Sequence, residues 1–337
     1  MRFDLLFENL MDRGVHAADL RLLMDLYSRQ RIRTLWKNKH SAYFGTQNGI
    51  RQGSIASPVL FCIYLDNLIK KLRRKGVGCW VGGSFFGALA YADDVALLCP
   101  SIGGLQEMVK MCEEFAAEWD LTFNSQKSMC LHFSRKKEEE RRPVRLNGIE
   151  LKWTSTFKYL GNHVSQDLEE REDVGRKRGD LFGRTNAVLA QAHGVSKEIT
   201  CKIFKTQCAH LYGAETWSLA DKNVPLIFTA INRCVRRVFD LPYRTHRRYL
   251  PIFARCKPYE EQIMCRTRKL ISKMKNVNPS VSTLSTCCLH DARLISAMNV
   301  CYCDSYEPET TVEDNAIVQA VHELRERPPE FFLPDEV

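Results

Sequence analysis

The chain has 337 residues, of which 45% are hydrophobic and 26% are charged, and its net charge is +9, a composition typical of a globular protein with two or three domains. Ten acids and two arginines give residues 304–337 a charge of −8 and leave +17 for the rest, which predicts a polyanionic partner such as nucleic acid, although a basic protein without one has the same composition. Acids interrupt the N-terminal segment and no apolar run reaches about 18 residues, so we expect neither a signal peptide nor a membrane partner. We expect an intracellular chain, nuclear or cytoplasmic or both, with reduced cysteines.

The first predicted elements are two helices, a basic strand and a third helix. Leucines recur at helical spacing over residues 5–28 on both sides of Gly14, which predicts two helices with a break between them. Residues 29–39 hold five basic side chains among apolar ones and predict a strand, whose polar face lies either against phosphates or simply in solvent. A loop rich in glycine and serine follows, and Pro58 marks the first turn of a helix whose apolar positions run over residues 60–72.

Two adjacent carboxylates lie inside the next apolar run. The sequence LAYADDVALL, residues 89–98, alternates around Asp93 and Asp94 and predicts a strand, a tight turn and a second strand. Because burial of two ionised neighbours is costly, we expect a positive group beside them. A hairpin tip with two acids suits a hard cation such as Mg²⁺, which prefers oxygen ligands, but a merely polar turn explains the same ten residues.

A helix, a strand and a charge run follow. Apolar side chains recur every three or four residues over residues 104–120, which predicts an amphipathic helix. Residues 121–133 return to alternation and predict a turn and a strand around Lys127. Residues 135–142 are a charge run typical of an exposed loop or linker.

The second half of the chain changes from strand to helix. In VRLNGIELKW the dipeptide Asn147-Gly148 predicts a two-residue hairpin turn, and residues 157–164 predict another single short strand. Residues 174–274 are helical and basic and carry no strand signal. Residues 276–337 mix Ser, Thr, Pro and acids, and we expect weak order there.

Four segments, in this order, resemble the successive palm motifs of reverse transcriptases in the form found in non-LTR, LINE-like retrotransposons. They are GIRQGSIASPVLFCIYLDNL, AYADDVALL, LTFNSQKSMCLHF and FKYLGNHV, and their order and spacing are far more specific than a lone YxDD tetrapeptide. The segments CKIFKTQCAHLYGAETWSL and NRCVRRVFDLPYR look like the thumb and downstream region of the same elements. The resemblance covers about residues 5–270 and implies an α+β fold, in which a right-hand polymerase palm, an antiparallel sheet with packed helices, precedes a mainly helical thumb.

The resemblance implies RNA-templated DNA synthesis by a two-metal mechanism and assigns roles to individual residues. Asp93 and Asp94 would be catalytic metal ligands for Mg²⁺, with Mn²⁺ as the alternative, while Lys127 would protonate departing pyrophosphate or be a plain surface lysine. The implied contacts to template and nucleotide are Gly49, Arg51, Gln52, Gly53 and Tyr91, and the implied primer grip is Tyr159, Leu160 and Gly161. The implied partners are an RNA template, a DNA primer and a deoxynucleoside triphosphate (dNTP), with basic residues after position 171 contacting phosphates.

The family pattern also includes parts that we do not find. A two-metal site uses one more carboxylate, from a strand that the family places before a helix resembling LLFENLMDRG; Asp4 is the nearest acid, and a helix N-cap explains it more simply. We therefore expect a truncated palm without fingers or first palm motif, catalytically impaired when alone; whether a partner chain restores the missing strand stays open. The competing hypothesis is a non-catalytic nucleic-acid-binding remnant.

These assignments divide the chain into four segments. Residues 1–134 are the expected incomplete palm, and residues 135–170 are the expected linker hairpin and primer-grip region. Residues 171–275 form the expected thumb-like and downstream helical region, and residues 276–337 form the weakly ordered acidic tail.

Overall fold

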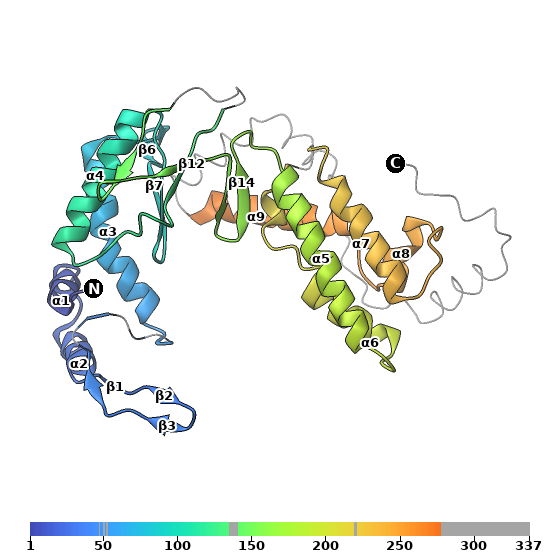
Figure 1. Ribbon diagram of the computed structural model, residues 1–337, viewed down its shortest axis with the longest axis horizontal. Coiled ribbons are helices and arrows are strands. Elements are labelled where there is room, and N and C mark those ends of the chain that lie inside the picture. The colour runs from blue at the N-terminus through green and yellow to red at the C-terminus, as the bar shows by residue number, and fades with distance from the viewer. Residues whose placement is uncertain (47, 50, 52, 135–140, 219–220, 278–337) are drawn as a thin grey trace. The chain divides into compact units, whose positions relative to one another are not determined.

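The computed structural model describes residues 1–277, except 47, 50, 52, 135–140 and 219–220 (Figure 1). The chain divides into two compact units. The first comprises Met1–Cys130 and a segment that ends at Trp153, and the second comprises the residues from Thr154 together with a short segment that starts at Leu131. The predicted weak order of residues 276–337 falls almost entirely outside the described residues.

Four helices form the frame of the first unit: α1 (Phe3–Asp12), α2 (Ala17–Ser28), α3 (Ser57–Lys75) and α4 (Ile102–Glu118). The predicted break between α1 and α2 is confirmed, and Gly14 lies in it with a φ of +72°. The predicted helix after Pro58 is confirmed as α3, with this proline in the first turn. Ser101 caps α4, because its hydroxyl accepts the backbone N–H of Gly104 at 3.1 Å.

The strands of the first unit are short and pair two by two. They are β1 (Arg31–Ile32), β2 (Leu35–Trp36), β3 (Lys39–His40), β4 (Phe44–Gly45), β5 (Trp80–Val81), β6 (Ser84–Phe85), β7 (Ala88–Tyr91), β8 (Asp94–Leu97), β9 (Met129–Leu131), β10 (Arg145–Leu146), β11 (Ile149–Glu150) and β12 (Lys152–Thr154). Antiparallel pairs join β1 to β4, β2 to β3, β5 to β6, β7 to β8 and β10 to β11, and β9 pairs with β12. Small antiparallel ladders between helices therefore give the expected α+β class.

The predicted strand over residues 29–39 is wrong, and the predicted turn at Asn147 and Gly148 is confirmed. Residues 29–39 are not one strand, because Lys37 and Asn38 both have positive φ and reverse the chain after Trp36, so β2 and β3 make a hairpin in solvent. The predicted turn at Asn147 and Gly148 has positive φ at both residues and connects β10 to β11.

Helix α3 contributes to two hydrophobic cores of the first unit. Leu60 and Tyr64, near its start, pack with buried side chains of α1 and α2. Leu65, Leu68 and Leu72 pack against β7 and α4, and Figure 1 shows these two elements beside α3. A third core lies against α4 and includes residues of β9 and β10. The hairpin of β7 and β8 is thus anchored at its base by the C-terminal half of α3.

The second unit begins with a hairpin and continues in helices. Strands β13 (Thr156–Tyr159) and β14 (Asn162–Ser165) pair antiparallel, and the main helices are α5 (Arg171–Gln191), α6 (Lys197–Ile203), α7 (Pro225–Val238), α8 (Leu250–Phe253) and α9 (Tyr259–Val277). The prediction of a single strand over residues 157–164 is wrong, because Leu160 and Gly161 have positive φ and turn the chain back. The helical prediction for residues 174–274 is confirmed over the described part of that range, in which no strand occurs.

One core holds the second unit together. It includes Leu181 of α5, Phe204 after α6, and Ile227 and Ile231 of α7, each at most 1% exposed. Trp217, between α6 and α7, joins the same core at 4% exposure. No helix in the described part of either unit has the length and apolarity needed to span a membrane.

Candidate functional site

The two adjacent carboxylates lie at the tip of the hairpin formed by β7 and β8. Tyr91 pairs with Asp94, so only Ala92 and Asp93 form the loop between the strands. Ala92 has a φ of +52°, the left-handed conformation that a two-residue turn requires. The predicted order of strand, tight turn and strand is confirmed, and the whole tip from Tyr91 to Asp94 is exposed.

The pairing register decides which side chains of this hairpin face the core. Val95 and Leu97 pack against α3 and α4 together with Ala88, whereas Leu89 and Tyr91 are 42% and 67% exposed. Leu89, Tyr91, Val95 and Leu97 therefore do not share one buried face. Because successive residues of a strand point to opposite faces, Asp94 lies on the same open face as its partner Tyr91.

The positive neighbour expected for Asp93 and Asp94 is absent from the part of the chain that the structure describes, where neither carboxylate forms an ion pair. Both carboxylates are exposed, so the burial on which that expectation rests does not occur, and exposed carboxylates need no such compensation. Their oxygens suit Mg²⁺ or Mn²⁺ as ligands. Within the described residues, no group of three or more His, Cys, Asp or Glu is arranged to hold a metal ion.

The predicted template and nucleotide loop precedes α3. Gly49 and Gly53 have φ of +110° and +83°, which only glycine adopts without strain. The backbone N–H of Gly49 donates to the carbonyl oxygen of Met1 at 3.2 Å, and the hydroxyl of Ser57 donates to the carbonyl oxygen of Arg51 at 2.6 Å. The Arg51 side chain is exposed, and Gln52 lies outside the described residues.

Lys127 and Asp4 are the two remaining residues of the first unit for which the sequence predicted a role. Lys127 lies in the turn before β9, where its backbone N–H donates to Asn124, and its side chain is exposed. The N-cap role predicted for Asp4 is wrong, because α1 begins at Phe3 and Arg2 occupies the N-cap position. Asp4 instead pairs with Arg2, and the hydrogen bond from this guanidinium lowers the pKa of the carboxyl group.

Tyr159, Leu160 and Gly161 form the turn of the hairpin of β13 and β14 in the second unit. Tyr159 pairs with Asn162 across the loop formed by Leu160 and Gly161. The ring of Tyr212 covers Gly161 so closely that an added Cβ atom would lie 3.0 Å from Tyr212 Cε1. Sequence patterns alone did not indicate this contact between residues about fifty positions apart.

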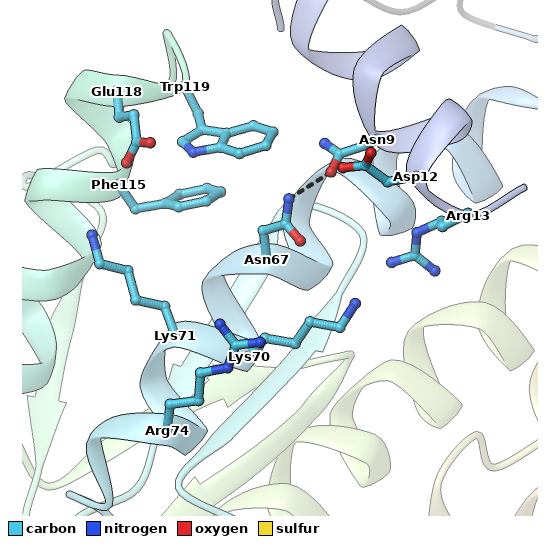
Figure 2. Close-up of a pocket in the computed structure, with 10 residues that line it drawn as sticks. All are labelled: Asn9, Asp12, Arg13, Asn67, Lys70, Lys71, Arg74, Phe115, Glu118 and Trp119. Carbon is cyan, nitrogen blue, oxygen red and sulfur yellow. Dashed lines mark hydrogen bonds between the residues drawn. The ribbon is translucent and has the colours of Figure 1, made fainter.

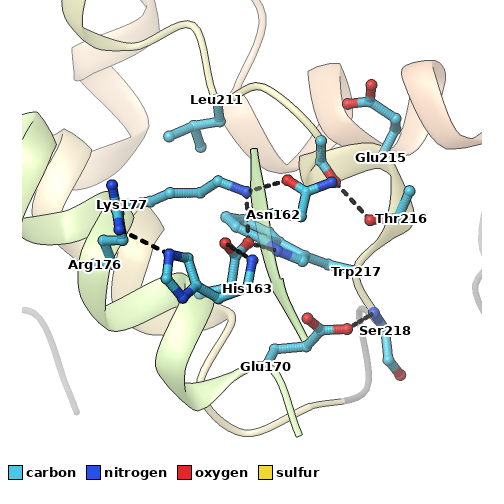
Figure 3. Close-up of polar contacts among 12 residues, drawn as sticks. Asn162, His163, Glu170, Arg176, Lys177, Leu211, Glu215, Thr216, Trp217 and Ser218 are labelled. Atoms are coloured by element: carbon cyan, nitrogen blue, oxygen red, sulfur yellow. Dashed lines mark hydrogen bonds and ion pairs between the residues drawn. The ribbon is translucent and has the colours of Figure 1, made fainter. Parts of the chain in front are cut away.

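Polar contacts hold this hairpin to α5, and Figure 3 shows Lys177 of α5 directed at Asn162 of the hairpin. Asp173 is 3% exposed and accepts hydrogen bonds from the backbone N–H of His163 at 3.0 Å and from Trp217 Nε1 at 2.7 Å. Lys177, one turn further along α5, pairs with Asp173 and donates to Asn162 Oδ1 at 3.0 Å. Its ammonium group also lies over the Trp217 ring, 4.9 Å from the centroid.

The sequence alone does not indicate this network. The segment CKIFKTQCAHLYGAETWSL that contains Trp217 resembled the family, but no role followed from that resemblance. The spacing of Asp173 and Lys177, four residues apart on one helix face, was the available signal for an ion pair. Such a pair on a surface would contribute little, and only the fold reveals that it is buried.

A cavity of about 570 Å³ lies between α1, α3 and α4 of the first unit (Figure 2). Its floor includes the stacked rings of Phe115 and Trp119, and Asn67 Nδ2 donates to Asn9 Oδ1 at 2.6 Å on its wall. The basic side chains around it belong to Arg13, Lys70, Lys71 and Arg74. None of the residues predicted for the catalytic or binding site lines this cavity.

Comparison with known proteins shows which family model and which proteins this chain is similar to. Residues 4–164 match the family model described as reverse transcriptase (RNA-dependent DNA polymerase). The chain is 26% identical over 203 residues to a Pol polyprotein from the type-1 retrotransposable element R1 of Bradysia coprophila, a match that covers 56% of this chain and 19% of that protein. It is 25% identical over 259 residues to the probable RNA-directed DNA polymerase from transposon BS of Drosophila melanogaster, covering 71% and 27%.

A third relative is the RNA-directed DNA polymerase from mobile element jockey of Drosophila funebris, which is 26% identical over 185 residues, covering 52% of this chain and 20% of that protein. The chain thus spans less than a third of the length of these curated relatives.

Proposed function

We propose that this chain, whose residues 4–164 are a reverse transcriptase domain of the non-LTR retrotransposon type, uses its first unit as the palm of an RNA-directed DNA polymerase. The observation that carries the proposal is the exposed pair Asp93 and Asp94 at the tip of a two-residue hairpin inside the matched segment. We assign the second unit the thumb-like role of binding the nucleic-acid duplex.

In this proposal Asp93 is the main ligand for Mg²⁺ or Mn²⁺ and Asp94 is its supporting neighbour. Bound divalent ions lower the pKa of an attacking hydroxyl group and neutralise charge on the transferred phosphate. Asp93 lies in the loop and not in a strand, and its side chain is exposed. Tyr91, on the same open face as Asp94, is the proposed contact to the end of the primer or the incoming nucleotide.

The loop before α3 is the proposed contact for template and dNTP. Gly49 and Gly53 carry no side chain, and an added Cβ atom at either position would meet nothing within 4 Å, so the backbone is open to a ligand. Arg51 supplies a positive charge there and Gln52 an amide, while Lys127 is the proposed proton donor to pyrophosphate. Tyr159, Leu160 and Gly161 are the proposed primer grip.

We further propose that the chain alone is a weak polymerase. The described residues bring two carboxylates to the hairpin tip and hold no cluster of three acids, whereas a two-metal site relies on a larger set of oxygen ligands. A further carboxylate, from a partner chain for example, would then raise the activity.

Primer extension on an RNA template with Mg²⁺ tests the function. Asp93→Asn should lower nucleotide incorporation by about 10³-fold or more, because metal ligands act as a unit. The matched control is Asp19→Asn, an exposed acid of α2 outside every proposed contact, which should leave incorporation unchanged. Equal incorporation by the wild type and Asp93→Asn would disprove the proposed role of the hairpin.

The second candidate function is a nucleic-acid-binding protein without catalysis. It is favoured by the charge of +17 outside residues 304–337 and by the incomplete acid cluster among the described residues. Binding of a primer–template with a steep salt dependence, together with no incorporation that depends on Asp93, would favour this candidate.

A further inference from the structure

Two basic side chains, one from the β13–β14 hairpin and one from α5, lie around a histidine on one face of the hairpin. Lys158 and His163 are register partners, so their side chains lie on the same face of the hairpin. Arg176 of α5 reaches this face, and its Nη1 atom lies 2.8 Å from His163 Nε2. An arginine can only donate, so Nε2 is the acceptor and the imidazole ring is neutral, with its proton on Nδ1.

The charges around His163 are unbalanced. Arg176, Lys158 and Lys177 all lie near the ring, and Asp173 is the opposing acid. Asp173 does not balance the charges of Arg176 and Lys158, since its carboxylate pairs with Lys177 and accepts two further hydrogen bonds. Burial, followed by the charge of Arg176, lowers the pKa of His163 below its ordinary value.

Neither remaining cation has an acidic partner among the residues that the structure describes. Arg176 and Lys158 are exposed, and Arg176 keeps most of its five N–H donors free beyond the bond to His163. The two unpaired cations, Lys158 of the hairpin and Arg176 of α5, thus lie beside a neutral ring. An anion with several acceptor oxygens satisfies these donors and this charge at once.

We propose that Lys158, His163 and Arg176 bind one phosphate group of a nucleic-acid backbone beside the turn of β13 and β14. The inference rests on the proposed function, since this turn contains the proposed primer grip. Arg176 supplies a planar pair of N–H donors and Lys158 supplies a point charge, while His163 is a positioning residue that orients the guanidinium.

The test is the affinity of the full chain for a fluorescein-labelled DNA primer annealed to an RNA template, measured by anisotropy over a range of NaCl concentrations. Lys158→Gln and Arg176→Gln should each raise the Kd roughly threefold to tenfold, and each should lower the slope of log Kd against log salt by about 1. The matched control is Lys110→Gln, an exposed lysine of α4 in the first unit and outside every proposed contact, which removes the same charge and should leave the slope unchanged.

A second measurement uses the wild type and does not depend on how the variants fold. The pKa of His163, followed through its ring proton signal by NMR, should rise when the primer–template binds, because a phosphate offsets the nearby cations. An unchanged pKa in the complex, or slopes for Lys158→Gln and Arg176→Gln equal to that of Lys110→Gln, would overturn the inference and leave the proposed function standing. No binding by the wild type would overturn both.

Discussion

Tyr91 and Asp94 face each other across a two-residue loop, and this pairing puts an aromatic ring and a carboxylate on the same open face of one hairpin. This turn holds the loop residue Ala92 at a φ of +52°, a left-handed conformation that is unfavourable for residues other than glycine. The position of the acid pair therefore depends on a residue that has no functional group.

Replacement of Ala92 tests this dependence. A β-branched side chain is strained at positive φ, so Ala92→Val should destabilise the first unit by roughly 1–2 kcal/mol and lower Mg²⁺-dependent incorporation. Ala92→Gly is the matched control, since glycine adopts this conformation freely and should keep the wild-type activity. Urea unfolding and primer extension measure the two effects, and equal behaviour of both variants would contradict the argument.

Gly213 should not tolerate a methyl group. An added Cβ atom would lie 2.1 Å from Asn162 Oδ1, and Lys177 holds that side chain in place. We expect Gly213→Ala to cost about 1–3 kcal/mol by overpacking, in addition to strain at a φ of +76°. Thermal unfolding of the full chain is the measurement.

The control for Gly213 is another glycine of the second unit. Gly179 lies inside α5 with open space around it, and Gly179→Ala should stabilise the protein by up to about 1 kcal/mol because alanine is the better helix former. A Gly213→Ala variant as stable as the wild type would mean that the contact with Asn162 is not rigid.

Asp173 should be essential for the stability of the second unit. Asp173→Ala leaves the Lys177 side chain, which is 12% exposed, without its carboxylate and removes the acceptor from Trp217. Loss of one partner of a buried ion pair typically costs about 3–5 kcal/mol. The free energy of unfolding in urea measures this, and Asp180→Ala on the exposed face of the same helix should change it by less than about 0.5 kcal/mol.

Glu170 should make stability depend on pH. Burial raises the pKa of Glu170 above its ordinary value of 4.5, although the backbone N–H of Ser218 donates to its carboxylate at 3.2 Å and opposes the shift. The folded state therefore binds the Glu170 proton more tightly than the unfolded state, so stability from this group is present below pH 4.5 and is lost as the pH rises through the folded pKa.

The substitution Glu170→Gln removes this titration and keeps an acceptor for Ser218. Its free energy of unfolding, relative to that of the wild type, should increase from pH 4 to neutral pH, as measured by urea unfolding at each pH. Glu172→Gln, an exposed neighbour, controls for general charge effects. A difference that is constant with pH would contradict the assignment.

Local patterns predicted the elements of this chain better than their contacts. The helix with Pro58 in its first turn and the turn at Asn147 and Gly148 follow from signals within a few residues, and both are confirmed. The prediction of one strand over residues 157–164 is wrong because Leu160 and Gly161 both have positive φ and divide the segment into a hairpin. Periodicity cannot separate a short strand from half of a hairpin.

In the candidate site, too, local turns follow from the sequence and contacts between distant segments do not. The tip that carries Asp93 and Asp94 follows from ten residues of sequence, whereas the burial of Asp173 against Trp217 depends on two segments 44 residues apart. No local signal reports such a contact, since it arises only when α5 and the segment before α7 enclose one core.

Helix α3 has a consequence for how the first unit unfolds. Its first half is buried with α1 and α2, and its second half is buried with β7 and α4. Neither core can unfold locally without exposing apolar side chains of this one continuous helix. The loop that contains Gly49 and the hairpin that contains Asp93 should therefore lose their structure in a single cooperative transition. The backbone amides at the two ends of α3 should be protected from hydrogen exchange to a similar degree.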